Sequence, residues 1–145
     1  MNDAPTIHAS AVLVGAKAAL IRGPAGSGKS QLAWQLLGTL PFVRLVADDR
    51  AHLQAHAGRL LVRPAAPLAG LIEVRGLGIR RLAYEPLATV GLVIDLAAAD
   101  ANRFPGGTAG RATLEGVSLP RLAVAPDQDA LPLLLAFLGT SPAAD

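Results

Sequence analysis

The sequence has no cysteine and few aromatic residues, and each scarcity excludes a class of site. None of the 145 residues is a cysteine, so the chain can form neither a disulfide framework nor a thiolate metal site. Aromatic residues make up only 3% of the chain, the net charge is +2, and the basic residues are scattered. Nucleic-acid surfaces combine a basic stripe with stacking aromatics. We therefore expect no nucleic-acid partner.

The chain also lacks a long apolar run, although 52% of its residues are hydrophobic. The two longest apolar stretches, 88–99 and 130–138, are interrupted by Asp95 and Pro132 and fall short of the ~20 residues that span a bilayer. The first five residues carry no basic segment with an apolar run after it, as a secretory signal would. These features predict a cytoplasmic protein without a membrane partner, folded as one domain over residues 1–145.

A glycine-rich segment matches the phosphate-loop pattern G-x-x-x-x-G-K-[ST] at every fixed position. It consists of Gly23, Pro24, Ala25, Gly26, Ser27, Gly28, Lys29 and Ser30. In such a loop the glycines let backbone N–H groups point at phosphate oxygens. The lysine binds the β- and γ-phosphates, and the serine hydroxyl joins the shell of a Mg²⁺ ion. The segment therefore predicts a site for a nucleoside triphosphate with Mg²⁺.

The surroundings of this loop predict a β-rich fold. A short apolar strand precedes the loop, and a helix at 31–37 follows it and is expected to end at Gly38. A second helix is predicted at 128–138, and a tight bend at 76–78. Strands are predicted at 7–14, 17–22, 43–48, 52–56, 59–63, 71–75, 89–95, 112–114 and 117–119. Most of these strands form hairpins, whereas a doubly wound fold would join parallel strands by crossover helices. We predict an α/β domain of the α+β, β-rich kind.

Two adjacent carboxylates end the strand predicted at 43–48. Asp48 and Asp49 lie 18 and 19 residues after Ser30. In phosphate-loop enzymes, a carboxylate in such a place holds Mg²⁺ or accepts the proton of the attacking hydroxyl. Neighbouring strand residues face opposite sides, so we expect the two aspartates to have different roles. The alternative is a simple turn at the end of the strand.

Three further side chains are candidates with alternatives left open. Glu73 is flanked by apolar strand residues and shares a strand face with Arg75, so it is either a functional carboxylate or half of an ion pair. Asp95 ends an apolar strand in the manner of a Walker B aspartate and competes for the metal role. His8 lies fifteen residues before Gly23, on the strand expected to pair with the one entering the loop. It is either a site residue or a structural histidine.

Taken together, these segments resemble the catalytic domain of bacterial HPr kinase/phosphorylase, in its short form without the amino-terminal domain. The resemblance rests on His8, the phosphate loop, the segment RLVADD at 44–49 and the segment GLIEVRGLGI at 70–79, of which the last is the most specific. It covers residues 7–82 well and the remainder loosely. Such enzymes transfer phosphate from ATP to a serine of HPr, a small carrier protein of the phosphotransferase system. Their fold is akin to that of phosphoenolpyruvate carboxykinase, so the resemblance implies a phosphate-loop kinase domain of that type.

The resemblance also implies roles for individual residues. It implies Asp49 as the base, Lys29 as the phosphate ligand, Ser30 and Glu73 as Mg²⁺ ligands, His8 as a site residue and Arg103 as an arginine finger. It further implies ATP as the cofactor nucleotide, an HPr-like substrate and a homo-oligomer, a hexamer in the family. Only residues 119–122 are comparable with the family's arginine-rich carboxy-terminal motif, which leaves phosphorylase activity open. An ATP-sensing regulatory module without phosphoryl transfer is the alternative function, and a small GTPase is disfavoured because no Asn-Lys-x-Asp segment is present.

Overall fold

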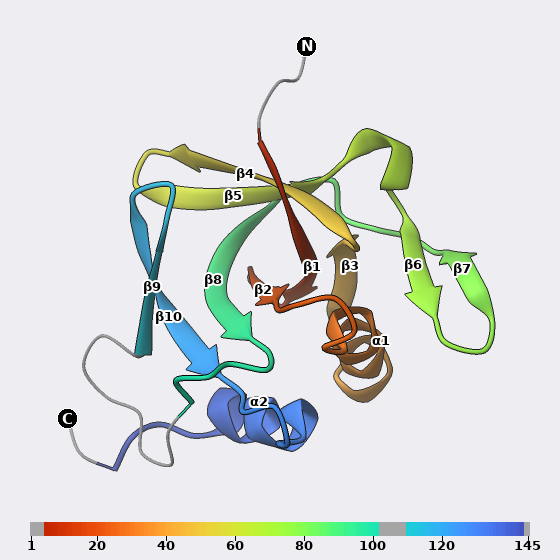
Figure 1. Cartoon of the computed structure of the whole chain (residues 1–145). Helices are drawn as coiled ribbons and strands as arrows, with labels where there is room; N and C mark the ends of the chain where they lie inside the picture. Colours follow the sequence, from red (N-terminus) through yellow and green to blue (C-terminus); the bar gives the residue numbers. More distant parts are fainter. Residues whose placement is uncertain (1–4, 102–109, 144–145) are drawn as a thin grey trace.

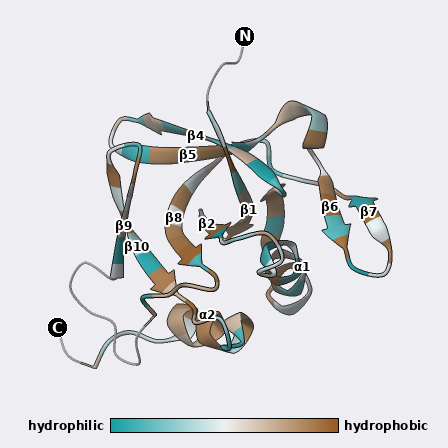
Figure 2. Ribbon diagram, in the orientation of Figure 1, coloured by the Kyte–Doolittle hydropathy of each residue, from teal (hydrophilic) through white to brown (hydrophobic). Residues whose placement is uncertain are grey.

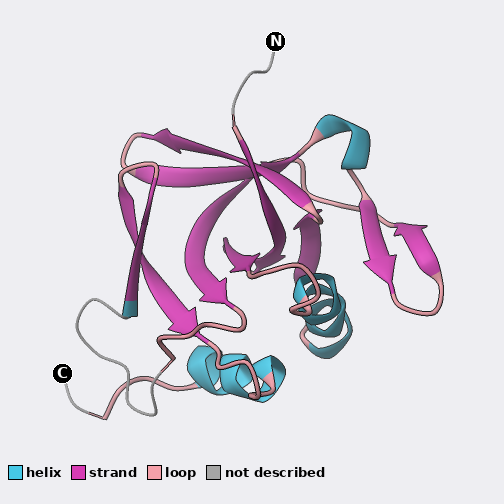
Figure 3. Cartoon of the chain, viewed as in Figure 1, coloured by secondary structure: helices cyan, strands magenta, loops and turns pink. Residues whose placement is uncertain are grey.

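The computed structural model describes residues 5–101 and 110–143, and strands dominate it (Figures 1 and 3). The strands are β1 (Thr6–Val14), β2 (Lys17–Arg22), β3 (Val43–Ala47), β4 (Arg50–His56), β5 (Arg59–Pro64), β6 (Leu71–Val74), β7 (Gly78–Arg81), β8 (Ala88–Asp95), β9 (Arg111–Leu114) and β10 (Val117–Ala123). The helices are α1 (Lys29–Thr39), α2 (Ala130–Gly139) and the short 3-10 helix η1 (Ala66–Leu68). In this described part of the chain, no helix is long and apolar enough to cross a membrane.

Five strands pair in a closed ring. β1 pairs antiparallel with β2 and with β4, β4 pairs with β5, β5 pairs with β8, and β8 returns to β2 in parallel (Figure 1). β3 attaches to β1, and β10 joins β8 in parallel and β9 antiparallel. The β6–β7 hairpin forms a separate two-stranded sheet. This hairpin-rich mixed topology confirms the predicted β-rich α/β domain.

Strands β2 and β8 contribute side chains to two apolar clusters, one on each of their faces. Leu20 and Val93 belong to a cluster with residues of β4 and β5, whereas their neighbours Ile21 and Ile94 pack with the two helices. This division follows the alternation of side chains along a strand. Figure 2 shows the corresponding apolar colour on β8 and on α2. Helix α1 is therefore packed on the outer face of the strands that lead into and flank the phosphate loop.

The structure differs from local expectations at the end of the first helix and in the β6–β7 hairpin. Gly38 does not end the first helix, which continues to Thr39 and is followed by a hydrogen bond from the Leu40 amide to the Leu36 carbonyl. Strand β7 was not predicted, because all four of its residues are exposed and show no half-buried alternation. The predicted bend at 76–78 is present and reverses the chain between β6 and β7.

Candidate active site

The phosphate loop joins the end of β2 to the start of α1, and its backbone requires glycine. Gly26 has φ +81°, and Gly28, which caps α1, has φ +100°, both in the left-handed region. A Cβ atom on Gly23 would lie 2.5 Å from the Ser27 Oγ and 3.1 Å from the Leu96 Cβ. The loop therefore has the conformation that its glycines were expected to allow.

Lys29 closes across this loop. Its Nζ donates to the carbonyl oxygens of Gly23, at 2.8 Å, and Pro24, at 3.2 Å. The same residue begins α1, and the first turn of a helix carries partial positive charge on its free N–H groups. The loop thus carries an ammonium group and leads into a helix terminus, and each of these favours the binding of phosphate.

Next to the loop, Asp48 gathers hydrogen bonds from three elements. It accepts from the Ser30 hydroxyl at 2.7 and 2.8 Å, from the Ser10 hydroxyl of β1 at 2.6 Å, and from the Glu73 amide of β6 at 3.1 Å. Asp48 is 5% exposed, and a buried carboxylate is stable only when donors surround it. The Ser30 and Asp48 oxygens therefore form a fixed pair of hard ligands beside the loop.

Asp49 faces solvent instead. Its side chain is 67% exposed, and its carboxylate lies 3.9 Å from the Nδ1 of His8, which is 63% exposed. The two aspartates face different ways, as predicted, but the reason is not strand alternation. β3 already ends at Ala47, and Asp49 has φ +70° in a tight turn before β4. A turn at the end of the strand was the alternative interpretation of the two aspartates, and such a turn is therefore present as well.

Glu73 lies in the β6–β7 hairpin, opposite Ile79, and its side chain is exposed. No salt bridge to Glu73 is found among residues 5–101 and 110–143, so an ion pair with Arg75 is not observed there. The hydrogen bond from its amide to Asp48 joins this part of β6 to the Ser30–Asp48 pair. The carboxylate of Glu73 is thus free of any salt bridge within the described ranges.

The Asp95 carboxylate forms ion pairs with two arginines. Arg22 donates to both of its carboxylate oxygens, at 2.7 and 2.8 Å, and Arg121 donates to one of them at 2.6 Å. Arg121 also donates twice to Asp100, each time at 2.9 Å. Partial burial alone would raise the pKa of Asp95, but the hydrogen bonds from Arg22 and Arg121 outweigh it and the pKa is lowered. Asp95 is therefore an ion-pair residue that holds the strand entering the loop, and these contacts favour a structural role over that of a Walker B metal ligand.

The remaining candidates are placed as follows. Arg103 lies outside the described residues. Within residues 5–101 and 110–143, no group of three or more histidine, aspartate or glutamate side chains could hold a metal ion by itself. Mg²⁺ commonly takes one or two carboxylates and completes its shell with phosphate oxygens and water. The oxygen pair at Ser30 and Asp48 suits this kind of coordination.

Sequence reasoning missed Ser10. It is fully buried in β1, and its hydroxyl donates to Asp48. The signal was present, because Ser10 is the single polar residue in the apolar run 9–14. A buried hydroxyl in such a run needs a partner, and the carboxylates at the ends of predicted strands were Asp48, Asp49 and Asp95.

Comparisons with known proteins give the family and the fold. Residues 1–84 match the family described as the HPr serine kinase C-terminal domain. The structure is similar to that of the HPr(Ser) kinase/phosphatase from Coxiella burnetii, with 25% sequence identity, a TM-score of 0.73 and coverage of 93% of each chain. No curated protein matches the sequence. The structural similarity covers more of the chain than residues 1–84.

Proposed function

Since the chain belongs to the HPr serine kinase C-terminal domain family, we propose that it is a Mg²⁺- and ATP-dependent protein kinase that phosphorylates a serine of an HPr-like phosphocarrier. The observation that carries this proposal is the position of the turn 48–49 beside the phosphate loop. One aspartate of the turn contacts the loop serine, and the other faces solvent. A kinase that phosphorylates another protein needs fixed ligands for its metal ion and a base that the protein substrate can reach.

The residues of the phosphate loop and its surroundings fit a nucleoside triphosphate. The loop forms a cradle that a Cβ atom on Gly23 would fill, and the buried Ser27 Oγ has no hydrogen-bond partner in the described part of the chain. Its loop amides and the Lys29 ammonium would bind the phosphates. Ser30 and Glu73 would hold Mg²⁺, with Asp48 as a further ligand, directly or through water. When bound, Mg²⁺ neutralises charge on the phosphates.

Asp49 would act on the substrate serine. Its exposed carboxylate can be reached by a hydroxyl on the surface of a partner protein, as a buried one could not. It accepts the proton from this hydroxyl while the serine oxygen bonds to the γ-phosphorus and the bond from that phosphorus to the bridging oxygen breaks, which releases ADP. His8 lies beside this carboxylate and would line the entry for the serine.

The test is a transfer assay with a matched control. The chain is incubated with Mg²⁺, labelled ATP and the HPr-like protein of the same organism, and the label on a serine is located by mass spectrometry. Lys29→Ala should abolish the transfer. Lys17, the only other lysine, is exposed on β2, and Lys17→Ala should leave the transfer unchanged.

Two results would contradict the proposal in different ways. ATP binding without transfer to any carrier serine would favour the ATP-sensing regulatory module. Equal ATP affinity in wild type and Lys29→Ala would show that the phosphate loop is not the ATP site.

A further inference from the structure

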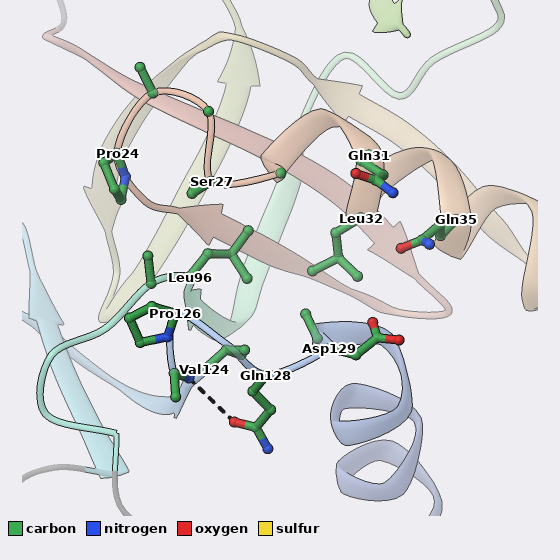
Figure 4. A pocket seen from close by; sticks show the side chains of 16 residues that line it. Pro24, Ser27, Gln31, Leu32, Gln35, Leu96, Val124, Pro126, Gln128 and Asp129 are labelled. Atoms are coloured by element: carbon green, nitrogen blue, oxygen red, sulfur yellow. Dashed lines mark hydrogen bonds between the residues drawn. The ribbon is translucent and has the colours of Figure 1, made fainter.

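A cleft of about 400 Å³ opens directly beside the phosphate loop. One wall consists of residues 24–28 of the loop and the side of α1 that carries Gln31 and Gln35. The chain between β10 and α2, from Val124 to Ala130, forms the other wall, and Leu96 lies between the two (Figure 4). Its volume lies within the ~300–1,000 Å³ that is typical of small-molecule sites.

The lining of this cleft is apolar and neutral rather than basic. Apolar side chains face it from both walls, among them Leu32, Leu96 and Pro126. Among the described residues that line it there is no lysine, arginine or histidine, and the one charged residue there, Asp129, accepts a hydrogen bond from the Leu131 amide at the start of α2. The side chains of this lining therefore favour an uncharged group with an apolar surface.

Three carboxamides supply the polar part of the lining. Gln31 and Gln35 lie one turn apart on α1, and Gln128 stands on the opposite wall (Figure 4). The Oε1 of Gln128 accepts from the Ala125 amide at 3.3 Å, which leaves its NH₂ group to donate. A carboxamide can donate and accept at once, as it does toward the edge of a purine base.

The cleft lies on the side of the loop that faces residues 124–130, and the Ser30–Asp48 contact is not part of it. Residues 24–28 line the cleft, whereas Lys29, Ser30 and Asp48 do not. A nucleotide whose terminal phosphate lies at Lys29 and Ser30 would have its nucleoside end at the cleft. We propose, on the premise that the loop binds a nucleoside triphosphate, that this cleft is a purine-nucleoside subsite in which Gln35 and Gln128 contact the nucleoside.

The experiment separates the nucleoside from the phosphate tail. Calorimetry compares Mg²⁺ complexes of ATP, GTP, CTP and inorganic tripolyphosphate on wild type, Gln35→Ala and Gln128→Ala. Gln54→Ala is the matched control, because Gln54 is an exposed glutamine of β4 that does not line the cleft. Circular dichroism and thermal unfolding confirm that each variant is folded.

If the cleft is a purine-nucleoside subsite, wild type should bind ATP and GTP at least about tenfold more tightly than CTP or tripolyphosphate. Each cleft variant should weaken ATP binding about 2–10-fold, the equivalent of one lost hydrogen bond, and leave tripolyphosphate binding unchanged. Equal affinity for ATP and tripolyphosphate, or ATP affinity insensitive to both substitutions, would overturn the subsite and leave the loop intact. CTP bound as tightly as ATP would overturn its purine character. If neither ATP nor tripolyphosphate binds, the proposed function itself fails.

Discussion

The hydroxyl oxygen of Ser30 lies 2.7 and 2.8 Å from the two carboxylate oxygens of Asp48. Ser30 lies in the first turn of α1 and Asp48 follows β3, so this contact fixes the phosphate-loop helix against the sheet. The Ser10 hydroxyl and the Glu73 amide hold the same carboxylate from two further strands. The contact thus prepares a pair of oxygen ligands before any metal binds.

Removal of the buried donor Ser10 tests this arrangement. Ser10→Ala should lower the free energy of unfolding by about 1–3 kcal/mol, because Asp48 then loses one partner of a buried charge. The Mg²⁺ concentration needed for half-maximal activity should rise as Asp48 becomes less fixed. Urea unfolding and Mg²⁺ titration measure the two effects. Ser118→Ala, on the exposed part of β10, is the control, and a Ser10→Ala protein as stable as this control would refute the role.

Loss of the Asp49 carboxylate should slow the chemical step and leave nucleotide binding nearly unchanged. Asp49→Asn keeps the shape of the side chain but removes its basicity, so turnover should fall by about 10²–10⁴-fold while ATP affinity stays within a few-fold. Single-turnover transfer of labelled phosphate, combined with ATP calorimetry, measures both. Asp48→Asn should instead weaken binding of the Mg²⁺ complex of ATP. Near wild-type turnover in Asp49→Asn would assign the base to another residue.

Glu73 is expected to hold Mg²⁺. Glu73→Gln should raise the Mg²⁺ requirement about tenfold or more, because a neutral amide is a weaker ligand for a hard cation than a carboxylate. Activity is measured over a Mg²⁺ series, and thermal unfolding is measured alongside it. Arg75→Gln changes another charge on the same hairpin and should leave the Mg²⁺ requirement unchanged. A lower melting temperature of Glu73→Gln with a normal Mg²⁺ requirement would instead indicate a structural role.

The sequence predicted the loop and most strands because these depend on local signals. The phosphate loop is a run of eight residues whose glycines are needed for its conformation, as the positive φ of Gly26 and Gly28 illustrates. The contacts of Asp48 and Asp95 could not be predicted in this way. Ser10 reaches Asp48 across 38 residues, and Arg22 reaches Asp95 across 73. Which of several carboxylates meets which partner depends on the pairing of β1 with β3 and of β2 with β8, and no local pattern encodes that pairing.

The Arg22–Asp95–Arg121 ion pairs should make stability depend on pH. Hydrogen bonds from the two arginines lower the pKa of Asp95 below its ordinary 3.8 despite its partial burial, and a hydrogen bond from Arg121 lowers the pKa of Asp100. A lowered folded-state pKa stabilises the fold above the unfolded pKa, and this stabilisation is lost as pH falls through the folded value. Asp95→Asn should therefore be less stable than wild type by about 1–3 kcal/mol at pH 7. The difference should shrink below pH ~3.8. Urea unfolding from pH 7 to pH 2.5 measures it, and a constant difference over that range would exclude this linkage.

Gly23 provides the last test, because its φ of +158° and the close approach of Leu96 both oppose a side chain at this position. In Gly23→Ala the new Cβ would lie 2.5 Å from the Ser27 Oγ, 3.1 Å from the Leu96 Cβ and 3.2 Å from the Leu96 carbonyl oxygen. The Ser27 hydroxyl can rotate away, but Leu96 is held by the hydrogen bond from its amide to the Arg22 carbonyl. The loop itself must therefore move, and affinity for the Mg²⁺ complex of ATP should fall at least about tenfold, with a loss of stability of about 1–3 kcal/mol.

Gly38→Ala is the matched control for this substitution. Gly38 lies near the end of α1 and has no atom within 4 Å of an added Cβ, so alanine should leave ATP binding unchanged and stabilise the helix by up to about 0.5–1 kcal/mol. Calorimetry with ATP and thermal unfolding of the two variants give the comparison. Wild-type ATP affinity in Gly23→Ala would mean that the loop tolerates a side chain at its first glycine. The close approach of Leu96 would then not determine the shape of the phosphate site.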